Sequence, residues 1–126
     1  MLIHALRFNA AFSTFSGLGM VFGSNWLAPH LALPSVFLLA VGVGLLLFAG
    51  YLLWVHIKAE TRLQATPSIV VADAVWVVAV TGTAMVFREA ITSTGLGIVI
   101  ATSSVVALAA VLQFVGWRSE KEHSHA

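Results

Sequence analysis

The segment from Ser68 to Phe87 places the strongest constraint on how this chain can fold. It reads SIVVADAVWVVAVTGTAMVF, and a helix of about 20 apolar residues is long enough to cross the hydrocarbon core of a bilayer. It also contains Asp73, the only acidic residue within any apolar segment of the chain. A carboxylate in hydrocarbon is costly unless polar groups surround it, so the fold must bring partners to Asp73.

Three further apolar segments and the composition place the chain among membrane proteins. Of its 126 residues, 60% are hydrophobic and 9% are charged, whereas a soluble domain carries about 25% charged residues. The net charge is +1 and there is no cysteine, which argues against nucleic-acid binding, disulfides and thiol chemistry. We expect one all-α membrane domain, with four transmembrane helices arranged as two antiparallel hairpins in a bundle.

The apolar segments also set the predicted boundaries. We expect a transmembrane domain over residues 1–117, with spans at about 4–27, 35–56, 68–87 and 95–117, followed by a polar cytoplasmic tail over residues 118–126. The first apolar segment is longer than the core of a signal peptide, so we interpret it as a retained helix. Pro67 suits the first turn of the third helix, where its missing N–H is not needed.

The basic residues are distributed unevenly between the two predicted sides of the membrane. Four spans put both termini on one side, and Arg88 alone lies on the other. The positive-inside rule then predicts that both termini and the loop over residues 58–67 are cytoplasmic. The residues on the predicted cytoplasmic side are Arg7, Lys58, Arg62, Arg118 and Lys121.

Four polar side chains are predicted to lie at a similar shallow depth from the cytoplasmic side. They are Arg7, Asn9, Asp73 and Gln113. Asp73 follows Pro67 by six residues, which is about 9 Å along a helix. We expect Asp73 to accept hydrogen bonds from Arg7 and Asn9, with Gln113 nearby. Such a cluster could clamp helices together, or it could form a proton or cation site or a pocket for a polar head group.

Small residues at helical spacing indicate where the helices pack. Transmembrane helices approach closely where side chains are small, because lipid supplies no hydrophobic drive between them. We expect these residues to form the faces that hold the bundle together, with a homodimer face as the alternative. The predicted packing residues are Ser13, Ser16, Gly17, Gly44 and Ala107.

The histidines and hydroxyl residues give no clear catalytic or cofactor site. His4 and His56 lie at the ends of neighbouring helices, where a haem would be half in water, so haem ligation is a distant alternative. His123 and His125 form at most a weak metal pair. The sequence contains no nucleophile–base pair, glycine-rich phosphate loop or metal-ligand motif. We therefore expect a protein without catalysis, cofactor or metal.

Three segments of the sequence resemble a group of small bacterial four-helix membrane proteins. They are LRFNAAFSTFSGLG near the start, GVGLLLFAGYLLW in the second apolar segment, and DAVW around Asp73. The resemblance implies a bacterial inner-membrane protein and supplies no catalytic residues. The matching positions are Arg7, Asn9, Ser16, Gly17, Asp73 and Trp76.

Two functional hypotheses follow from these features. The first is a structural or accessory subunit of a larger membrane complex, or a lipid-associated bundle. The second is a small proton-coupled transporter with Asp73 as its coupling carboxylate. The chain length is similar to that of small multidrug-resistance exporters, but those depend on a glutamate in helix one, whereas the acid here lies in helix three. The expected partners are membrane lipid and, as further options, other membrane subunits or a second copy of the chain, but not nucleic acid.

Overall fold

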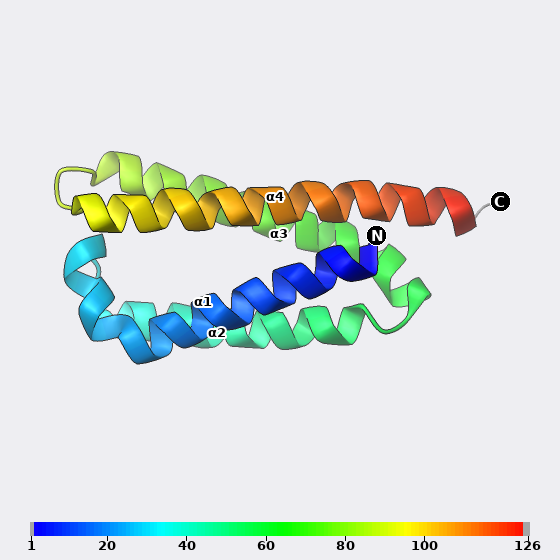
Figure 1. Cartoon of the computed structure of the whole chain (residues 1–126), viewed down its shortest axis with the longest axis horizontal. Coiled ribbons are helices and arrows are strands. Elements are labelled where there is room, and N and C mark those ends of the chain that lie inside the picture. Colours follow the sequence, from blue (N-terminus) through cyan, green and yellow to red (C-terminus); the bar gives the residue numbers. More distant parts are fainter. Residues whose placement is uncertain (1, 125–126) are drawn as a thin grey trace.

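The computed structural model describes residues 2–124, which form four α-helices. The helices are α1 (Leu2–Leu31), α2 (Ser35–Val55), α3 (Ala59–Val86) and α4 (Ser93–Ser124). α1 and α2 form one antiparallel hairpin and α3 and α4 form the other, which confirms the predicted all-α architecture (Figure 1). The described chain ends and the α2–α3 connection lie at one end of the bundle, here called the terminal end. The turns within the two hairpins lie at the opposite end, here called the hairpin end.

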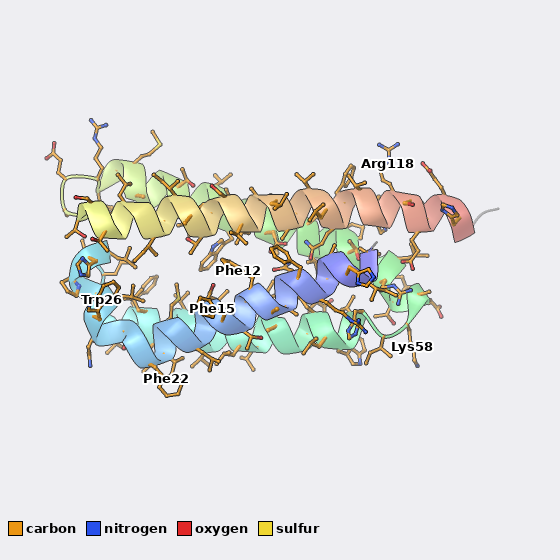
Figure 2. The ribbon with its side chains drawn as sticks, viewed as in Figure 1. Phe12, Phe15, Phe22, Trp26, Lys58 and Arg118 are labelled. Atoms are coloured by element: carbon orange, nitrogen blue, oxygen red, sulfur yellow. The ribbon has the colours of Figure 1, made fainter. Side chains whose placement is uncertain are left out.

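The surface of the bundle is apolar. Three helices, α2, α3 and α4, are long and apolar enough to cross a membrane. Large apolar side chains such as Leu47, Val78 and Phe22 are exposed, and Phe22 projects away from the bundle (Figure 2). A water-soluble bundle would bury most side chains of this kind. The structure therefore indicates that the protein is inserted in a membrane.

The buried apolar core lies toward the terminal end. It joins the first turns of α1 to the last turns of α2 and to α3, and Trp117 of α4 packs against it. α1 packs along α2 and also against α4, while the backbone of α2 makes little contact with α3 and none with α4. The two hairpins are thus joined mainly through α1 and α4. The core residues are Leu2, Leu6, Ala10, Leu52, Val55 and Ile69.

The contact between α1 and α2 depends on two glycines that face each other. A Cβ atom added to Gly17 would lie 2.8 Å from the carbonyl oxygen of Gly42, and one added to Gly42 would lie 2.9 Å from the carbonyl oxygen of Gly17. Both distances are too short for a side chain. Glycine is needed at both positions because the two backbones themselves are in contact.

The predicted packing residues divide into two groups. Ser13 and Gly17 are buried between helices, and Ser16 is half-buried. The expectation for Gly44 is wrong, because an added Cβ there meets no atom within 4 Å. Gly42 takes its place, since two residues correspond to about 200° around a helix and only one of the pair can face α1.

Ala107 is likewise not a packing residue, because it lies on the exposed face of α4. The buried residues of α4 form a stripe in which successive members are three or four residues apart. Position 107 is not one of them. Ala107 follows Val106 of this stripe by one residue, which is about 100° around a helix of 3.6 residues per turn, so it faces away from the contact. The stripe consists of Ser103, Val106, Ala109, Gln113 and Gly116.

Three helices extend beyond the boundaries predicted from hydrophobicity. α1 continues through Pro29 to Leu31, and α3 begins at Ala59 rather than at residue 68. α4 continues to Ser124, so residues 118–124 are helical instead of forming a separate tail. Residues 1, 125 and 126 lie outside the described part of the chain. The additional turns of α3 and α4 are polar and that of α1 contains Pro29, so apolar length alone does not detect them.

Pro67 lies inside α3, and the structure compensates for its missing N–H. In a regular helix the N–H at position 67 would bond to the carbonyl oxygen of Leu63, four residues earlier. Instead, the indole Nε1–H of Trp117 donates to this oxygen at 2.9 Å. This bond links α3 to α4 and satisfies a carbonyl that proline leaves without its helical donor.

Replacing Gly17 by alanine is expected to lower the free energy of unfolding by about 1–3 kcal/mol, because the added methyl group would push α1 and α2 apart. Gly19→Ala is the matched control in the same helix, since a Cβ at Gly19 meets nothing within 4 Å. That control should be neutral or stabilising, because alanine favours helix more than glycine does. Unfolding in mixed micelles with increasing denaturing detergent measures both effects. Equal losses in the two variants would contradict the close α1–α2 contact.

Trp117→Phe is expected to cost about 1 kcal/mol, because it removes the indole donor to the Leu63 carbonyl. In a Pro67→Ala background the cost should be smaller, since alanine at position 67 supplies its own backbone N–H to that carbonyl. Trp54→Phe serves as a control because Trp54 is exposed. A double-mutant cycle of unfolding free energies tests the coupling, and an equal cost of Trp117→Phe in both backgrounds would show that the hydrogen bond is not the source of the effect.

Candidate functional site

Three buried polar side chains from three helices form a closed hydrogen-bonded cluster, here called the polar triad: Asn9 of α1, Asp73 of α3 and Gln113 of α4. Asn9 Nδ2 donates to Asp73 Oδ2 at 2.9 Å and to Gln113 Oε1 at 2.8 Å. Gln113 Nε2 donates to the same Asp73 Oδ2 at 2.8 Å. The triad therefore ties α1 of one hairpin to both helices of the other.

The two amides are suited to this position because each can donate and accept at the same time. Asn9 uses both of its amide hydrogens, and its own Oδ1 accepts from the hydroxyl of Ser13 at 3.3 Å. The three triad side chains are at most 5% exposed. α1 and α3 have no close backbone contact. The two helices are connected through the side chains of Asn9 and Asp73.

Arg7 does not belong to this cluster, contrary to the expectation that it would bond to Asp73. Its side chain is exposed, and the structure gives it no hydrogen bond or ion pair with any of residues 2–124. The physical reason is the helical repeat: Arg7 and Asn9 are two residues apart, which places them about 200° apart around α1. Asn9 faces the triad, and Arg7 consequently faces outward.

Asp73 lies near the middle of α3, because this helix begins before the polar residues that precede Pro67. α3 begins at Ala59 and ends at Val86, so Asp73 is about 20 Å from either end of the helix. Asn9 and Ser13 sit on the inward face of α1. A carboxylate midway along a candidate membrane span is costly to maintain, which makes Asp73 a candidate functional residue.

Two members of the triad, Asn9 and Asp73, form part of the wall of a cavity between the two hairpins, here called the inter-hairpin cavity. Its volume is about 580 Å³, which is within the range of about 300–1,000 Å³ typical of small-molecule sites. All four helices contribute to its lining. Most lining side chains are apolar, among them Phe12, Leu45, Trp76 and Val99. Ser16 and Gly44 line this cavity as well, which explains why neither is packed tightly against another helix.

Among residues 2–124, Asp73 is the only charged residue in the lining of this cavity. Asn9 and Gln113 both donate to its Oδ2, which leaves Oδ1 without a hydrogen-bond partner among residues 2–124. Oδ1 is not among the fully enclosed unpaired side-chain oxygens, which are those of Thr66 and Ser103. The second carboxylate oxygen is therefore not fully enclosed, although Asp73 as a whole is buried.

A second tie joins the hairpins at the hairpin end. The backbone N–H of Thr92 donates to the carbonyl oxygen of His30 at 3.1 Å, and the Thr92 hydroxyl lies 2.8 Å from His30 Nδ1. Gly95 packs against the same His30 carbonyl so closely that a Cβ atom would collide with it. His30 also packs against the ring of Trp26. The cavity thus lies between two polar connections, the triad and the His30–Thr92 contact.

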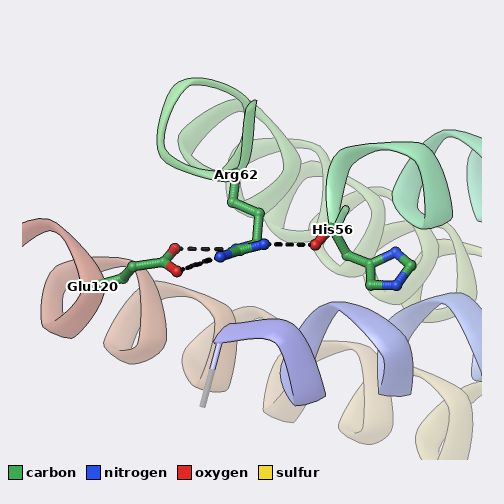
Figure 3. A network of polar contacts seen from close by, with 3 residues as sticks. All are labelled: His56, Arg62 and Glu120. Atoms are coloured by element: carbon green, nitrogen blue, oxygen red, sulfur yellow. Dashed lines mark hydrogen bonds and ion pairs between the residues drawn. The ribbon is translucent and has the colours of Figure 1, made fainter. Parts of the chain in front are cut away.

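A third polar cluster, at the terminal end, was not predicted from the sequence. Arg62 of α3 is buried and forms an ion pair with Glu120 of α4, with Nη2 2.6 Å from Oε1. Its Nη1 donates to the backbone carbonyl of His56, at the end of α2, also at 2.6 Å (Figure 3). Arg62 and Glu120 lie in segments predicted to be loop or tail, so no helical register linked them. The helical continuation of α3 and α4 brings them together.

The histidines do not converge on a common site. His4 is exposed, and His56 Nδ1 bonds to the carbonyl of Leu53 within its own helix end. His123 Nδ1 lies 2.7 Å from the carbonyl oxygen of Ser119. Within residues 2–124 no three potential histidine, cysteine or carboxylate ligands come close enough to hold a metal ion.

Comparisons of the chain with protein families, with curated proteins and with solved structures gave no match. The chemistry of the site therefore rests on its geometry. The inter-hairpin cavity offers an apolar volume whose wall includes one carboxylate with an unpaired oxygen, and the triad fixes that carboxylate in place.

Proposed function

We propose that this protein is a lipid-associated membrane bundle that holds an apolar chain in its inter-hairpin cavity, without catalysis, and serves as a small accessory component of the membrane. The observation that carries the proposal is the cavity itself, about 580 Å³ in volume and lined mainly by apolar side chains from all four helices. In a bilayer, lipid chains surround such a protein and match the chemistry of this lining.

The arrangement of the helices gives an apolar chain a route into the cavity. The backbones of α2 and α3 make little contact, and those of α2 and α4 make none, so we expect a chain to enter along that side. The triad and the His30–Thr92 contact hold the hairpins at two levels, and a chain can lie between them. A structural role and a lipid-binding role are compatible, because the bound chain would fill the space that the helices leave.

A dodecanol molecule carrying a photoreactive diazirine on its chain tests this proposal in phosphatidylcholine nanodiscs. Crosslinks should form at Val80, which lines the cavity, as well as at Val78, which is exposed on the outside of α3. Gly44→Phe should abolish crosslinking at Val80, because Gly44 lines the cavity with open space around it and a phenyl ring would occupy that space. Mass spectrometry of the digested protein measures both sites.

Gly50→Phe is the matched control for this experiment. Gly50 lies on the same helix, is exposed and has nothing within 4 Å of an added Cβ, but it does not line the cavity. It should leave crosslinking unchanged at both valines. Labelling at Val80 that survives Gly44→Phe, or that is absent from the unmodified protein, would overturn the proposal.

A second candidate function is proton-coupled transport with Asp73 as the coupling carboxylate. It is favoured by one specific observation: Asp73 lies midway along α3, on the wall of the cavity, with one oxygen that accepts no hydrogen bond from residues 2–124. Carboxylates in such positions mark proton and ion pathways in transporters.

The transporter candidate is tested by proton flux into liposomes that contain the protein and a pH-sensitive dye. Asp73→Asn should stop the flux, because an amide cannot release a proton, while the fold persists because an amide oxygen can still accept hydrogen bonds from Asn9 and Gln113. Gln113→Asn serves as a comparison that alters the triad but leaves the carboxylate. Flux that is equal in the unmodified protein and in Asp73→Asn would eliminate this candidate.

We further propose that all four helices span a bacterial inner membrane, with both termini in the cytoplasm. The proposal is supported for α1 by its 30-residue length and by its inward-facing Asn9 and Ser13, which lower its hydropathy without exposing polar groups to lipid. The orientation is supported by the basic residues, since Lys58 and Arg118 both lie at the terminal end (Figure 2).

A further inference from the structure

The residues that line the inter-hairpin cavity indicate which charge a bound molecule would carry. Within the part of the chain that the structure describes, the cavity's only charged residue is Asp73, and its lining contains no lysine, arginine or histidine. Within the described chain, no cation pairs with this carboxylate, because its hydrogen-bond donors are the neutral amides of Asn9 and Gln113. An uncompensated carboxylate in an apolar environment favours a ligand that brings a positive charge.

Aromatic residues stand beside this carboxylate. Trp76 follows Asp73 by three residues, so the two side chains are neighbours on one face of α3, and both line the cavity. Phe12 stands in the same relation to Asn9 on α1 and also lines the cavity. Ammonium groups are attracted to the faces of aromatic rings, most strongly to tryptophan. A carboxylate with adjacent aromatic faces is a suitable site for an amine.

We propose that the inter-hairpin cavity selects a single-chain amphiphile with a protonated amine head group, its alkyl chain along the apolar lining and its ammonium paired with Asp73. The inference rests on the proposed function, since it requires that the cavity hold an apolar chain. The ammonium N–H groups donate to Asp73 Oδ1, the oxygen that the triad leaves unpaired. The triad acts as the support that keeps the carboxylate oriented toward the ligand.

The experiment is a competition against the diazirine-bearing dodecanol at Val80, in the same phosphatidylcholine nanodiscs. The competitors are dodecylamine, unlabelled dodecanol and dodecanoate, which share one chain and differ in head-group charge. Labelling at the outward-facing Val78 normalises each competitor for its concentration in the lipid. Dodecylamine should displace the label at about tenfold lower concentration than dodecanol, because a charge-assisted contact is added, and dodecanoate should be the weakest competitor.

Asp73→Asn should make dodecylamine and dodecanol equal competitors, because the partner of the ammonium is lost while the apolar lining is kept. Trp76→Leu is a second variant that does not alter the triad. It should weaken dodecylamine several-fold and leave dodecanol nearly unchanged, since leucine keeps an apolar wall but has no aromatic face. If Asp73→Asn fails to fold, Trp76→Leu still tests the proposal, and an unchanged preference for dodecylamine in that variant would contradict it.

The outcomes separate the two proposals. Equal competition by the amine and the alcohol in the unmodified protein overturns the head-group inference and leaves the proposed function intact. A preference for the amine that persists in both variants overturns the assignment to Asp73 and Trp76. Absence of any specific labelling at Val80 overturns the proposed function itself.

Discussion

The hydrogen bonds that Asp73 accepts from Asn9 and Gln113 are the interaction on which this architecture depends. Helices in a bilayer gain little from burying apolar surface against one another, because lipid is equally apolar. Association then relies on close packing and on polar contacts between helices. Within the α1–α2 hairpin, Gly17 and Gly42 supply the close packing. Between the hairpins, the polar triad connects helices whose backbones are not in close contact.

The inter-hairpin cavity follows from this division of contacts. α1 and α4 meet near both ends of the bundle, where Gly116 packs against Leu2 and Gly95 packs against His30. α2 is held by α1 alone along most of its length. Two hairpins joined through one pair of helices, with bulky side chains such as Phe12 and Trp76 between them, leave a volume that the protein does not fill. The same carboxylate that joins the helices thereby becomes part of a cavity wall.

The differences between the predicted and observed structure concentrate where polar residues continue a helix. The segment 58–67 is rich in charge and ends in proline, which is typical of a loop, yet α3 begins at Ala59. Proline is tolerated there because Trp117 supplies the hydrogen bond to Leu63. That compensation comes from another helix, and a local pattern cannot reveal it. The ion pair of Arg62 and Glu120 was missed for the same reason.

The sequence by itself determined the number and kind of helices and the pairing of neighbouring segments into hairpins, because apolar length and short turns are local properties. It also indicated that Asp73 needs partners and that Asn9 and Gln113 were candidates, because a buried carboxylate must be hydrogen-bonded. Only the tertiary structure decided that Arg7 lies outside, that Gly42 replaces Gly44 at the contact, and that a cavity opens beside Asp73. Those features depend on the rotation of each helix about its axis, and packing against the other helices sets that rotation.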